Sequence, residues 1–207
     1  MSEPAWLTIA RELQAIAQTG LTFTKDRFDV QRYERLRELA SELMAHGSGS
    51  DTAKIVDLFR GESGYATPKV DVRGAAFRDG RVLMVREISD GLWTLPGGWA
   101  DVNQSASECV VREIFEESGF EARALKLAAV LDYQKAGHPK RALYSSYKMF
   151  FVCEITGGVA TPSNETSEVA FFDLHALPPL SLGRILPQQI ERLYEHSLNL
   201  DLPTDFD

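Results

Sequence analysis

The stretch GGWADVNQSASECVVREIFEESGF, residues 97–120, decides which fold this chain adopts. Ser105 and Glu108 have the S-x-x-E spacing of a capping box, which predicts that a helix begins there. Gly119 suits the left-handed backbone conformation that ends many helices. The stretch therefore predicts a glycine loop followed by a helix that ends at Gly119.

Two pairs of apolar residues lie four residues apart in this helix, Val110 with Ile114 and Val111 with Phe115. Residues at that spacing are neighbours on the helix surface. We therefore expect both flanks of the helix to be buried.

Three glutamates, Glu113, Glu116 and Glu117, lie at positions i, i+3 and i+4 and are predicted to converge on one helical face. Like charges at this spacing destabilise a helix by roughly 0.2–0.5 kcal/mol per pair, and a divalent cation would reverse that repulsion. Hard carboxylate oxygens suit Mg²⁺ or Mn²⁺ better than zinc. Arg112 lies four residues before Glu116 and is placed to orient the cluster. The alternative is a solvated acidic face, which the adjoining glycine loop and the expected burial disfavour.

The rest of the chain divides into two parts. Residues 1–60 follow helical periodicity, with a break at residues 46–50 and a third short helix that Asp51 caps. The segment 61–68 contains two glycines and a proline and is typical of a linker. We expect a helical N-terminal domain over residues 1–62, which is a candidate for dimerisation, and a second domain over residues 66–207.

The second part is predicted to be a mixed α/β domain. Asp79-Gly80 between two strand-like runs is a strong hairpin signal. The predicted strands are 70–77, 81–87, 124–133, 144–155 and 169–174, and a final helix is predicted over 186–198.

The composition limits the class of protein. The chain has 207 residues, of which 44% are hydrophobic and 25% charged, as in soluble globular proteins. A net charge of −8 argues against a broad basic surface for nucleic acid. Two distant cysteines are expected to be buried free thiols, which indicates a reducing compartment. With no apolar run of membrane length and no secretory signal in the sequence, we expect a cytoplasmic protein without a membrane partner.

The glycine loop and helix together resemble the Nudix box, G-x5-E-x7-R-E-U-x-E-E-x-G-U, where U is a bulky apolar residue. Eight of its specified positions match in register, namely Gly98, Arg112, Glu113, Ile114, Glu116, Glu117, Gly119 and Phe120. The box has a glutamate where this chain has Gln104. The resemblance covers roughly residues 68–195 and implies an α/β/α sandwich around a mixed β-sheet, preceded here by a small all-helical domain.

The resemblance implies a metal-dependent hydrolase of pyrophosphate bonds that uses Mg²⁺ or Mn²⁺. Glu116 and Glu117 would be the main metal ligands, and Glu113 would be a third ligand or the base that activates water. Arg112 would orient a glutamate, and the carbonyl of Gly97 would add a ligand. The change at Gln104 puts the rigidity of the loop in doubt before it puts the chemistry in doubt.

Several residues outside the box are further candidates. Glu168, preferred over Glu165, is expected to add an acidic ligand or base from a loop before the last strand. Arg73, on the first strand, is a candidate for binding substrate phosphate. The candidates for substrate contact also include a basic loop and an aromatic residue, namely Lys135, His138, Lys140, Arg141 and Trp99, although for Trp99 and Trp93 packing within the loop is the stronger interpretation.

The helical N-terminal region, with LPGGWADVN at 95–103 and ETSEVAFF at 165–172, resembles one Nudix subgroup. That subgroup implies CDP-choline or ADP-ribose as substrate, a nucleoside monophosphate and a phosphorylated compound as products, and a homodimer. The alternatives are a nucleotide-sensing Nudix domain without catalysis and a hydrolase that processes RNA ends.

Overall fold

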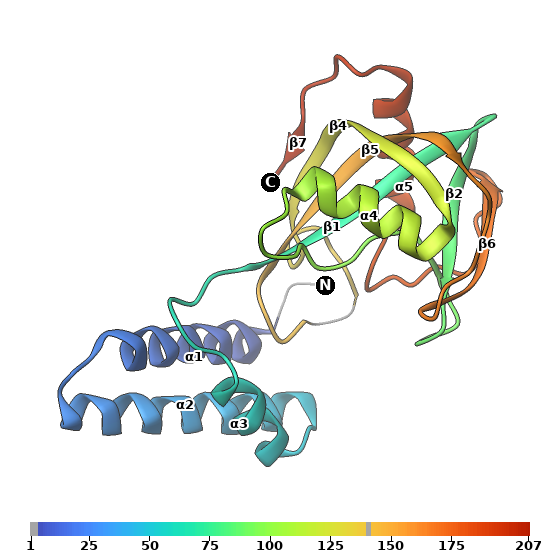
Figure 1. The fold of residues 1–207 in the computed structure, drawn as a ribbon. Helices are drawn as coiled ribbons and strands as arrows, with labels where there is room; N and C mark the ends of the chain where they lie inside the picture. The colour runs from blue at the N-terminus through green and yellow to red at the C-terminus, as the bar shows by residue number, and fades with distance from the viewer. Residues whose placement is uncertain (1–3, 140–141) are drawn as a thin grey trace. The chain divides into compact units, whose positions relative to one another are not determined.

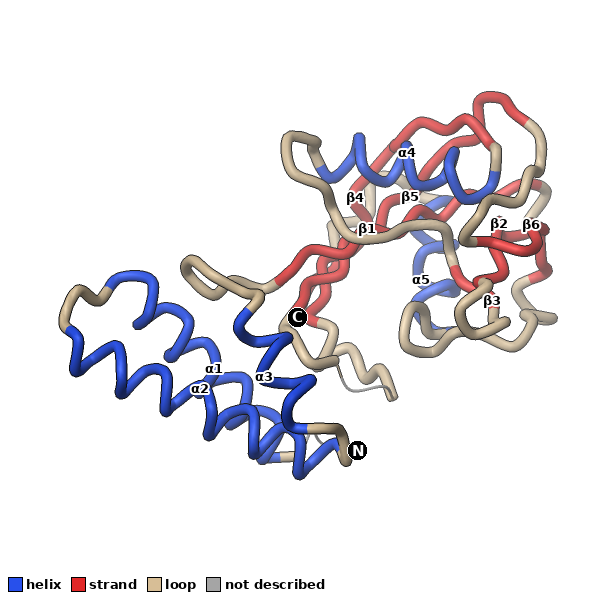
Figure 2. Tube along the Cα trace, turned by 60° about the horizontal axis from the view of Figure 1, so that its bottom comes forward, coloured by secondary structure: helices blue, strands red, loops and turns tan. Residues whose placement is uncertain are grey.

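The computed structural model describes residues 4–139 and 142–207. They form two compact units (Figures 1 and 2). The first unit contains the described residues up to Pro68 together with Ala142–Ser145, and the second contains the other described residues from Lys69 to Asp207.

The first unit is helical, as predicted, with α1 (Ala5–Phe23), α2 (Arg27–Ser48) and α3 (Thr52–Arg60). Asp26 and Asp51 begin α2 and α3, because each carboxylate accepts hydrogen bonds from two backbone amides of the first turn. The cap at Asp51 is the one that the sequence predicts. The core of this unit contains Leu7, Ala10, Ala40, Met44, Ala45, Ile55 and Phe59.

The second unit is built on one mixed sheet. Its strands are β1 (Lys69–Arg78), β2 (Arg81–Glu87), β3 (Trp93–Thr94), β4 (Phe120–Asp132), β5 (Ser146–Gly158), β6 (Thr166–Asp173) and β7 (Asp205–Phe206). The strand order is β3-β2-β1-β5-β4-β7, and β6 pairs with β2. The pairs β1·β5 and β4·β7 are parallel, and the others are antiparallel. The predicted mixed sheet is confirmed.

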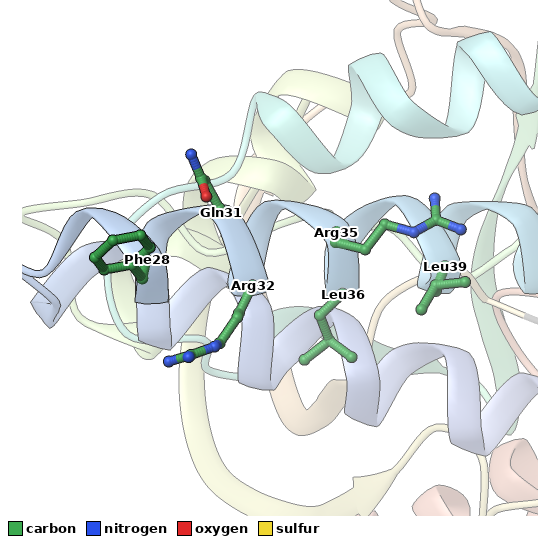
Figure 3. A pocket seen from close by; sticks show the side chains of 6 residues that line it. All are labelled: Phe28, Gln31, Arg32, Arg35, Leu36 and Leu39. Carbon is green, nitrogen blue, oxygen red and sulfur yellow. The ribbon is translucent and has the colours of Figure 1, made fainter.

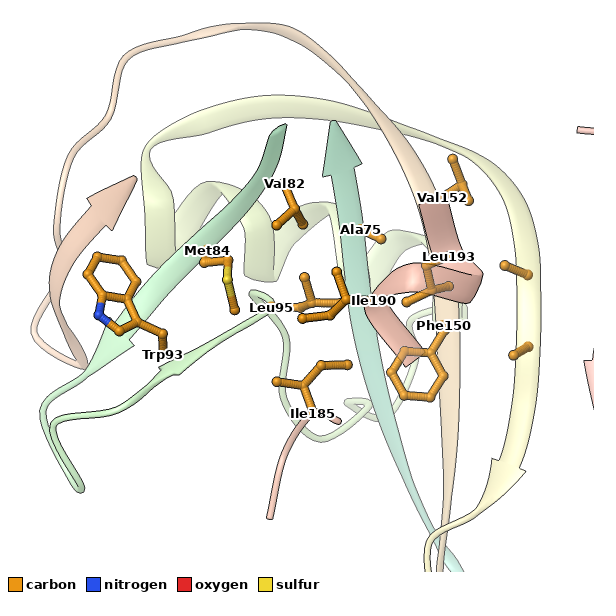
Figure 4. Packing of buried hydrophobic residues seen from close by; sticks show 12 residues of the cluster. Ala75, Val82, Met84, Trp93, Leu95, Phe150, Val152, Ile185, Ile190 and Leu193 are labelled. Carbon is orange, nitrogen blue, oxygen red and sulfur yellow. The ribbon is translucent and has the colours of Figure 1, made fainter. Parts of the chain in front are cut away.

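Two helices cover the two faces of this sheet, α4 (Ala106–Ser118) on one side and α5 (Pro187–Leu198) on the other (Figures 1 and 2). Val110 and Ile114 of α4 pack in one apolar cluster with β1, β2 and β5. Ile190 and Leu193 of α5 pack in a second cluster (Figure 4). The α/β/α sandwich is therefore confirmed, and both cysteines are buried and free as expected.

The helix α4 shows why the box folds as it does. The backbone amide of Ser105 donates to the Glu108 carboxylate at 2.8 Å, and the amide of Glu108 donates to the Ser105 hydroxyl at 3.3 Å. This is the predicted capping box, and Gly119 ends the helix with φ 74°. The prediction that both flanks are buried is wrong, because Phe115 is 54% exposed. The sheet contacts only one flank of α4, so apolar spacing along the other flank does not lead to burial.

The strand boundaries differ from the predicted ones mainly at β4, which begins at Phe120 rather than at residue 124. The short strands β3 and β7 were not predicted, because two residues are too few to show a period of two. None of the helices in the described part of the chain is both long and apolar enough to span a bilayer.

Gly119 and Gly91 provide a matched test of the packing behind α4. Both have positive φ, 74° and 69°, so alanine at either site should cost about 1 kcal/mol in backbone strain. A Cβ at Gly119 would lie 2.5 Å from the carbonyl oxygen of Val159, whereas at Gly91 it would meet nothing within 4 Å. Gly119→Ala should therefore lose a further ~1–3 kcal/mol in urea unfolding followed by tryptophan fluorescence. Equal losses in the two variants would contradict this account of the packing.

Candidate active site

The glycine loop before α4 lies directly against β1. The amide of Val72 donates to the carbonyl of Gly98 at 2.8 Å, and the amide of Gly74 donates to the carbonyl of Pro96 at 2.9 Å. Gly97 lies between these bonds with φ 142°, and a Cβ there would come within 2.0 Å of the Val72 carbonyl oxygen. Only glycine fits, because any side chain would separate the loop from the strand.

Two carboxylates of α4, one helical turn apart, face this loop. Glu117 is 6% exposed, and its Oε2 accepts a hydrogen bond from the amide of Gly97 at 2.9 Å. Glu113 lies beside Gly98, where an added Cβ would be 3.2 Å from the Glu113 Oε2. The close contact between loop and strand thus brings two acidic side chains against two glycines.

Burial makes these two carboxylates difficult to ionise. It raises the pKa of Glu117 to about 7, against the opposing effects of the Arg73 charge and the Gly97 amide. Burial also raises the pKa of Glu113, and the guanidinium of Arg112 opposes that shift. The charge of Glu113 raises the pKa of Glu117 further. Two neighbouring carboxylates in a desolvated position favour the binding of a cation.

Arg112 organises the outer part of the site. Its guanidinium binds Glu116 at 2.6 Å, Glu113 at 2.9 Å and Asp101 at 2.7 Å. Its Nε also donates to the Oε1 of Gln104 at 3.1 Å. Gln104, where the box has a glutamate, therefore still contacts the arginine, and Asp101 contributes a negative charge that the sequence prediction missed.

The three glutamates do not converge as predicted. Glu113 and Glu117 face the loop, whereas the side chain of Glu116 is 53% exposed and is held by Arg112. Residues at i and i+4 share a face more closely than those at i+3, which accounts for the separation. Within residues 4–139 and 142–207, no group of three His, Cys, Asp or Glu side chains is arranged to hold a metal ion. The donor set nevertheless fits a hard divalent cation, since the side-chain carboxylate of Glu117 has only a backbone amide as its hydrogen-bond partner among the described contacts.

The acidic candidate Glu168 does not lie in a loop, because β6 begins at Thr166. Glu168 pairs in register with Arg86 of β2, and their side chains form an exposed ion pair at 2.5 Å. Glu165 is exposed in the loop before β6. The alternation of apolar residues is weak over 165–169, which explains the misplaced strand start.

Arg73 is buried, with 4% exposure, and its guanidinium binds Asp71 and the carbonyl of Leu95. In this arrangement it is not available to a substrate phosphate. Asp71 and Lys148 contact each other at 2.6 Å and were not singled out in the sequence. In the sequence, the one local indication that Asp71 and Arg73 share a face of the sheet is their spacing of two residues within a predicted strand.

Trp93 and Trp99 differ in their exposure to solvent. Trp93 is buried and packs edge-on against Phe172, with ring centroids 4.6 Å apart. Trp99 is 55% exposed and follows the glycines, so its indole is open to a ligand.

The predicted basic loop is described only in part. His138 stacks on Tyr133, with ring centroids 4.5 Å apart, and its Nδ1 lies 2.8 Å from the carbonyl oxygen of Leu182. Lys135 is exposed, and Lys140 and Arg141 lie outside the described residues.

Two family models match this chain. Residues 4–59 match the model described as the UDP-X-like, N-terminal oligomerisation domain, and residues 67–193 match the NUDIX domain. The second match covers strands β1 to β6, α4 and the glycine loop.

Proteins similar over most of the chain carry related names. The Bacillus subtilis protein YjhB, provisionally named an ADP-ribose pyrophosphatase, is 46% identical over 98% of this chain and 97% of its own. A crystal structure of a UDP-X diphosphatase covers both chains completely, with 34% identity and a TM-score of 0.63. A crystal structure of an ADP-ribose pyrophosphatase from Streptococcus suis covers 68% of this chain and all of its own, with 41% identity and a TM-score of 0.63. The chain therefore belongs to the Nudix family of pyrophosphohydrolases.

Proposed function

We propose that this protein hydrolyses the pyrophosphate bond of nucleoside diphosphate derivatives with the help of Mg²⁺ or Mn²⁺. The observation that carries the proposal is the pair of desolvated carboxylates, Glu113 and Glu117, held against the backbone of Gly97 and Gly98. Two neighbouring carboxylates are costly to bury even with Arg112 beside Glu113, and a bound divalent cation offsets the cost.

The proposed ligands are the carboxylates of Glu113, Glu116 and Glu117 with the carbonyl of Gly97. When bound, a divalent ion neutralises the anionic pyrophosphate, activates a water and stabilises the leaving phosphate. Arg112 holds Glu113 and Glu116 in position through its ion pairs.

Two groups are candidates for accepting the proton of the attacking water. Glu113 is half-buried beside the loop, and burial raises its pKa, which suits a general base. Glu168 lies near the start of β6, where it pairs with Arg86 of β2. Trp99 is proposed to contact the substrate, because its exposed indole offers a flat apolar surface next to the glycines.

ADP-ribose and CDP-choline are the proposed substrates, and two of the similar proteins carry the name of an ADP-ribose pyrophosphatase. ADP-ribose would yield AMP and ribose 5-phosphate, and CDP-choline would yield CMP and phosphocholine.

A substrate panel tests this proposal. Hydrolysis should be followed as phosphate released by a coupled phosphatase, with ADP-ribose, CDP-choline, a UDP-sugar and nucleoside triphosphates. We expect kcat/KM for ADP-ribose or CDP-choline to exceed that for the triphosphates by at least about tenfold, or ~1.4 kcal/mol. A preference for triphosphates or RNA 5′ ends would refute the ranking, and nucleotide binding without turnover would indicate a sensor.

Glu116→Gln and Gln104→Ala test the assignment of the carboxylates. Loss of a charged ligand at Glu116 should lower kcat by about 10²–10³-fold, whereas loss of one neutral contact to Arg112 at Gln104 should lower it about tenfold. Without metal, Glu116→Gln should change stability by less than about 1 kcal/mol, because its ion pair is exposed. The rise in melting temperature on adding Mg²⁺ should shrink in this variant. If both variants lose the same activity and keep the full Mg²⁺ effect, the roles are assigned wrongly.

The helical unit is proposed to form a homodimer, in line with the oligomerisation model that matches residues 4–59. Ile9, Ile16 and Phe23 of α1 are seven residues apart and 47%, 47% and 66% exposed. Apolar side chains at this spacing lie along one side of a helix, as in helix–helix interfaces. They give α1 an apolar stripe that a second copy can cover.

A groove of ≈ 400 Å³ on α2 is a second partly apolar surface of this unit (Figure 3). It is lined by Phe28, Gln31, Arg32, Arg35, Leu36 and Leu39. Its arginines are paired within the helix, Arg32 with Asp29 at 2.6 Å and Arg35 with Glu38 at 2.9 Å. The groove therefore presents little unpaired charge and suits an apolar partner such as another copy of the same helix.

Leu39→Asp should shift the protein from dimer to monomer in size-exclusion chromatography with light scattering. A buried charge at an apolar interface is costly, and Leu39, 41% exposed in one chain, lines the groove. Ile88→Asp, at a 58% exposed position of the second unit, is the control and should leave the dimer intact. A wild-type monomer, or a Leu39→Asp dimer, would rule out this interface.

A further inference from the structure

Three charged side chains are buried together on the sheet face that α5 covers. Asp71 and Arg73 of β1 are 7% and 4% exposed, and Lys148 of β5 is 2% exposed. Asp71 and Arg73 share a face because they are two residues apart in a strand. Lys148 is the register partner of Asp71 in the parallel pair β1·β5, which places it on the same face.

Asp71 binds both cations. Its Oδ1 accepts from the Arg73 Nε at 3.0 Å, and its Oδ2 accepts from the Arg73 Nη2 at 2.8 Å, which makes a bidentate pair. The Lys148 ammonium donates to Oδ1 at 2.6 Å. Burial opposes the ionisation of Asp71, but the charges of Arg73 and Lys148 outweigh it and lower the pKa of this carboxyl.

A contribution to the stability of the fold does not explain why these three charged residues are buried here. Taking ions out of water is costly, and apolar residues of similar volume often stabilise a fold as well or better. The adjoining cluster of buried apolar residues, which includes Ala75 and Phe150 on the same two strands, shows that this face otherwise accepts apolar side chains.

Arg73 makes one further contact, which connects it to the glycine loop of the candidate active site. Its Nη1 donates to the carbonyl of Leu95 at 3.2 Å. Leu95 lies two residues before Gly97, whose amide binds Glu117. The positive charge of Arg73 also opposes the effect of burial on the pKa of Glu117. Arg73 thus fixes the start of the loop and lies close enough to Glu117 to stabilise its charge.

We propose that Arg73, held in place by Asp71 and Lys148, is a positioning residue that fixes the Leu95 carbonyl so that the Gly97 amide meets Glu117. This inference rests on the proposed function, because it assigns the residue to the hydrolytic site. It gives the buried arginine a role that needs no contact with substrate.

The test compares Arg73→Met and Arg73→Lys with Arg123→Met, a control at an exposed ion pair with Glu154 on β4 and β5. Hydrogen exchange of the Gly97 amide, measured by NMR on the metal-free protein, reports the loop directly. Both Arg73 variants should exchange at least about tenfold faster than wild type at this amide. Lysine at position 73 should not restore the slow exchange of the Gly97 amide, because it lacks the planar guanidinium that binds Asp71 and the Leu95 carbonyl together.

Activity provides the second measurement. In both Arg73 variants kcat should fall on the order of 10²-fold with KM nearly unchanged, as expected when reacting groups are misplaced. Arg123→Met should match wild type in both measurements. Full activity or unchanged Gly97 protection in Arg73→Lys or Arg73→Met would overturn the proposal.

A charge-conserving double variant covers the case in which Arg73→Met does not fold. Asp71→Asn with Lys148→Met removes one charge of each sign, the carboxylate that binds Arg73 and the ammonium that binds this carboxylate. The double variant should show the same faster exchange of the Gly97 amide and the same loss of kcat. Wild-type exchange or wild-type kcat in this variant would overturn the proposal. Because the exchange needs neither metal nor substrate, it still decides the positioning role if the wild-type protein hydrolyses none of the compounds in the panel.

Discussion

The contact between Gly97 and β1 is the constraint on which the site depends. The Gly97 backbone lies so close to the strand that an added Cβ would come within 2.0 Å of the Val72 carbonyl oxygen. This contact places the Gly97 amide where Glu117 can accept from it. The position of the buried carboxylate thus depends on the main-chain hydrogen bonds between loop and strand, and the contact of Arg73 with the Leu95 carbonyl adds support from a side chain.

The distribution of charge around α4 explains how the helix tolerates its acids. Glu116, Glu113 and Asp101 all bind Arg112, so one guanidinium already has three carboxylates. A fourth negative charge at Gln104 would add repulsion without another cation to offset it. The amide of Gln104 keeps the hydrogen bond to Arg112 and avoids that charge. Asp101 supplies from the loop the negative charge that the box has at position 104.

Local signals in the sequence were sufficient for α4, its capping box and the hairpin at Asp79-Gly80. They were not sufficient for contacts between residues far apart in the chain. Lys148 reaches Asp71 only because β5 pairs in parallel with β1, and no pattern within either strand indicates that register. For the same reason Arg73 was predicted to bind phosphate, since its burial depends on neighbours that the sequence does not reveal. The exposed position of Glu116 could not be predicted for a different reason, because the spacing of the acids predicts a shared face but not which acid pairs with Arg112.

The strand β1 connects the parts of the site because its successive residues face opposite sides of the sheet. Gly74 faces α4, where an added Cβ would come within 2.6 Å of the Ile114 side chain, so the helix packs tightly on the strand. Ile114 follows Glu113 and precedes Glu117 in α4, and its tight packing therefore fixes the height of both carboxylates above the sheet. Arg73, one residue earlier, faces the opposite side and binds the Leu95 carbonyl. One strand thus holds the helix from one face and the loop from the other, and the two meet where Gly97 binds Glu117.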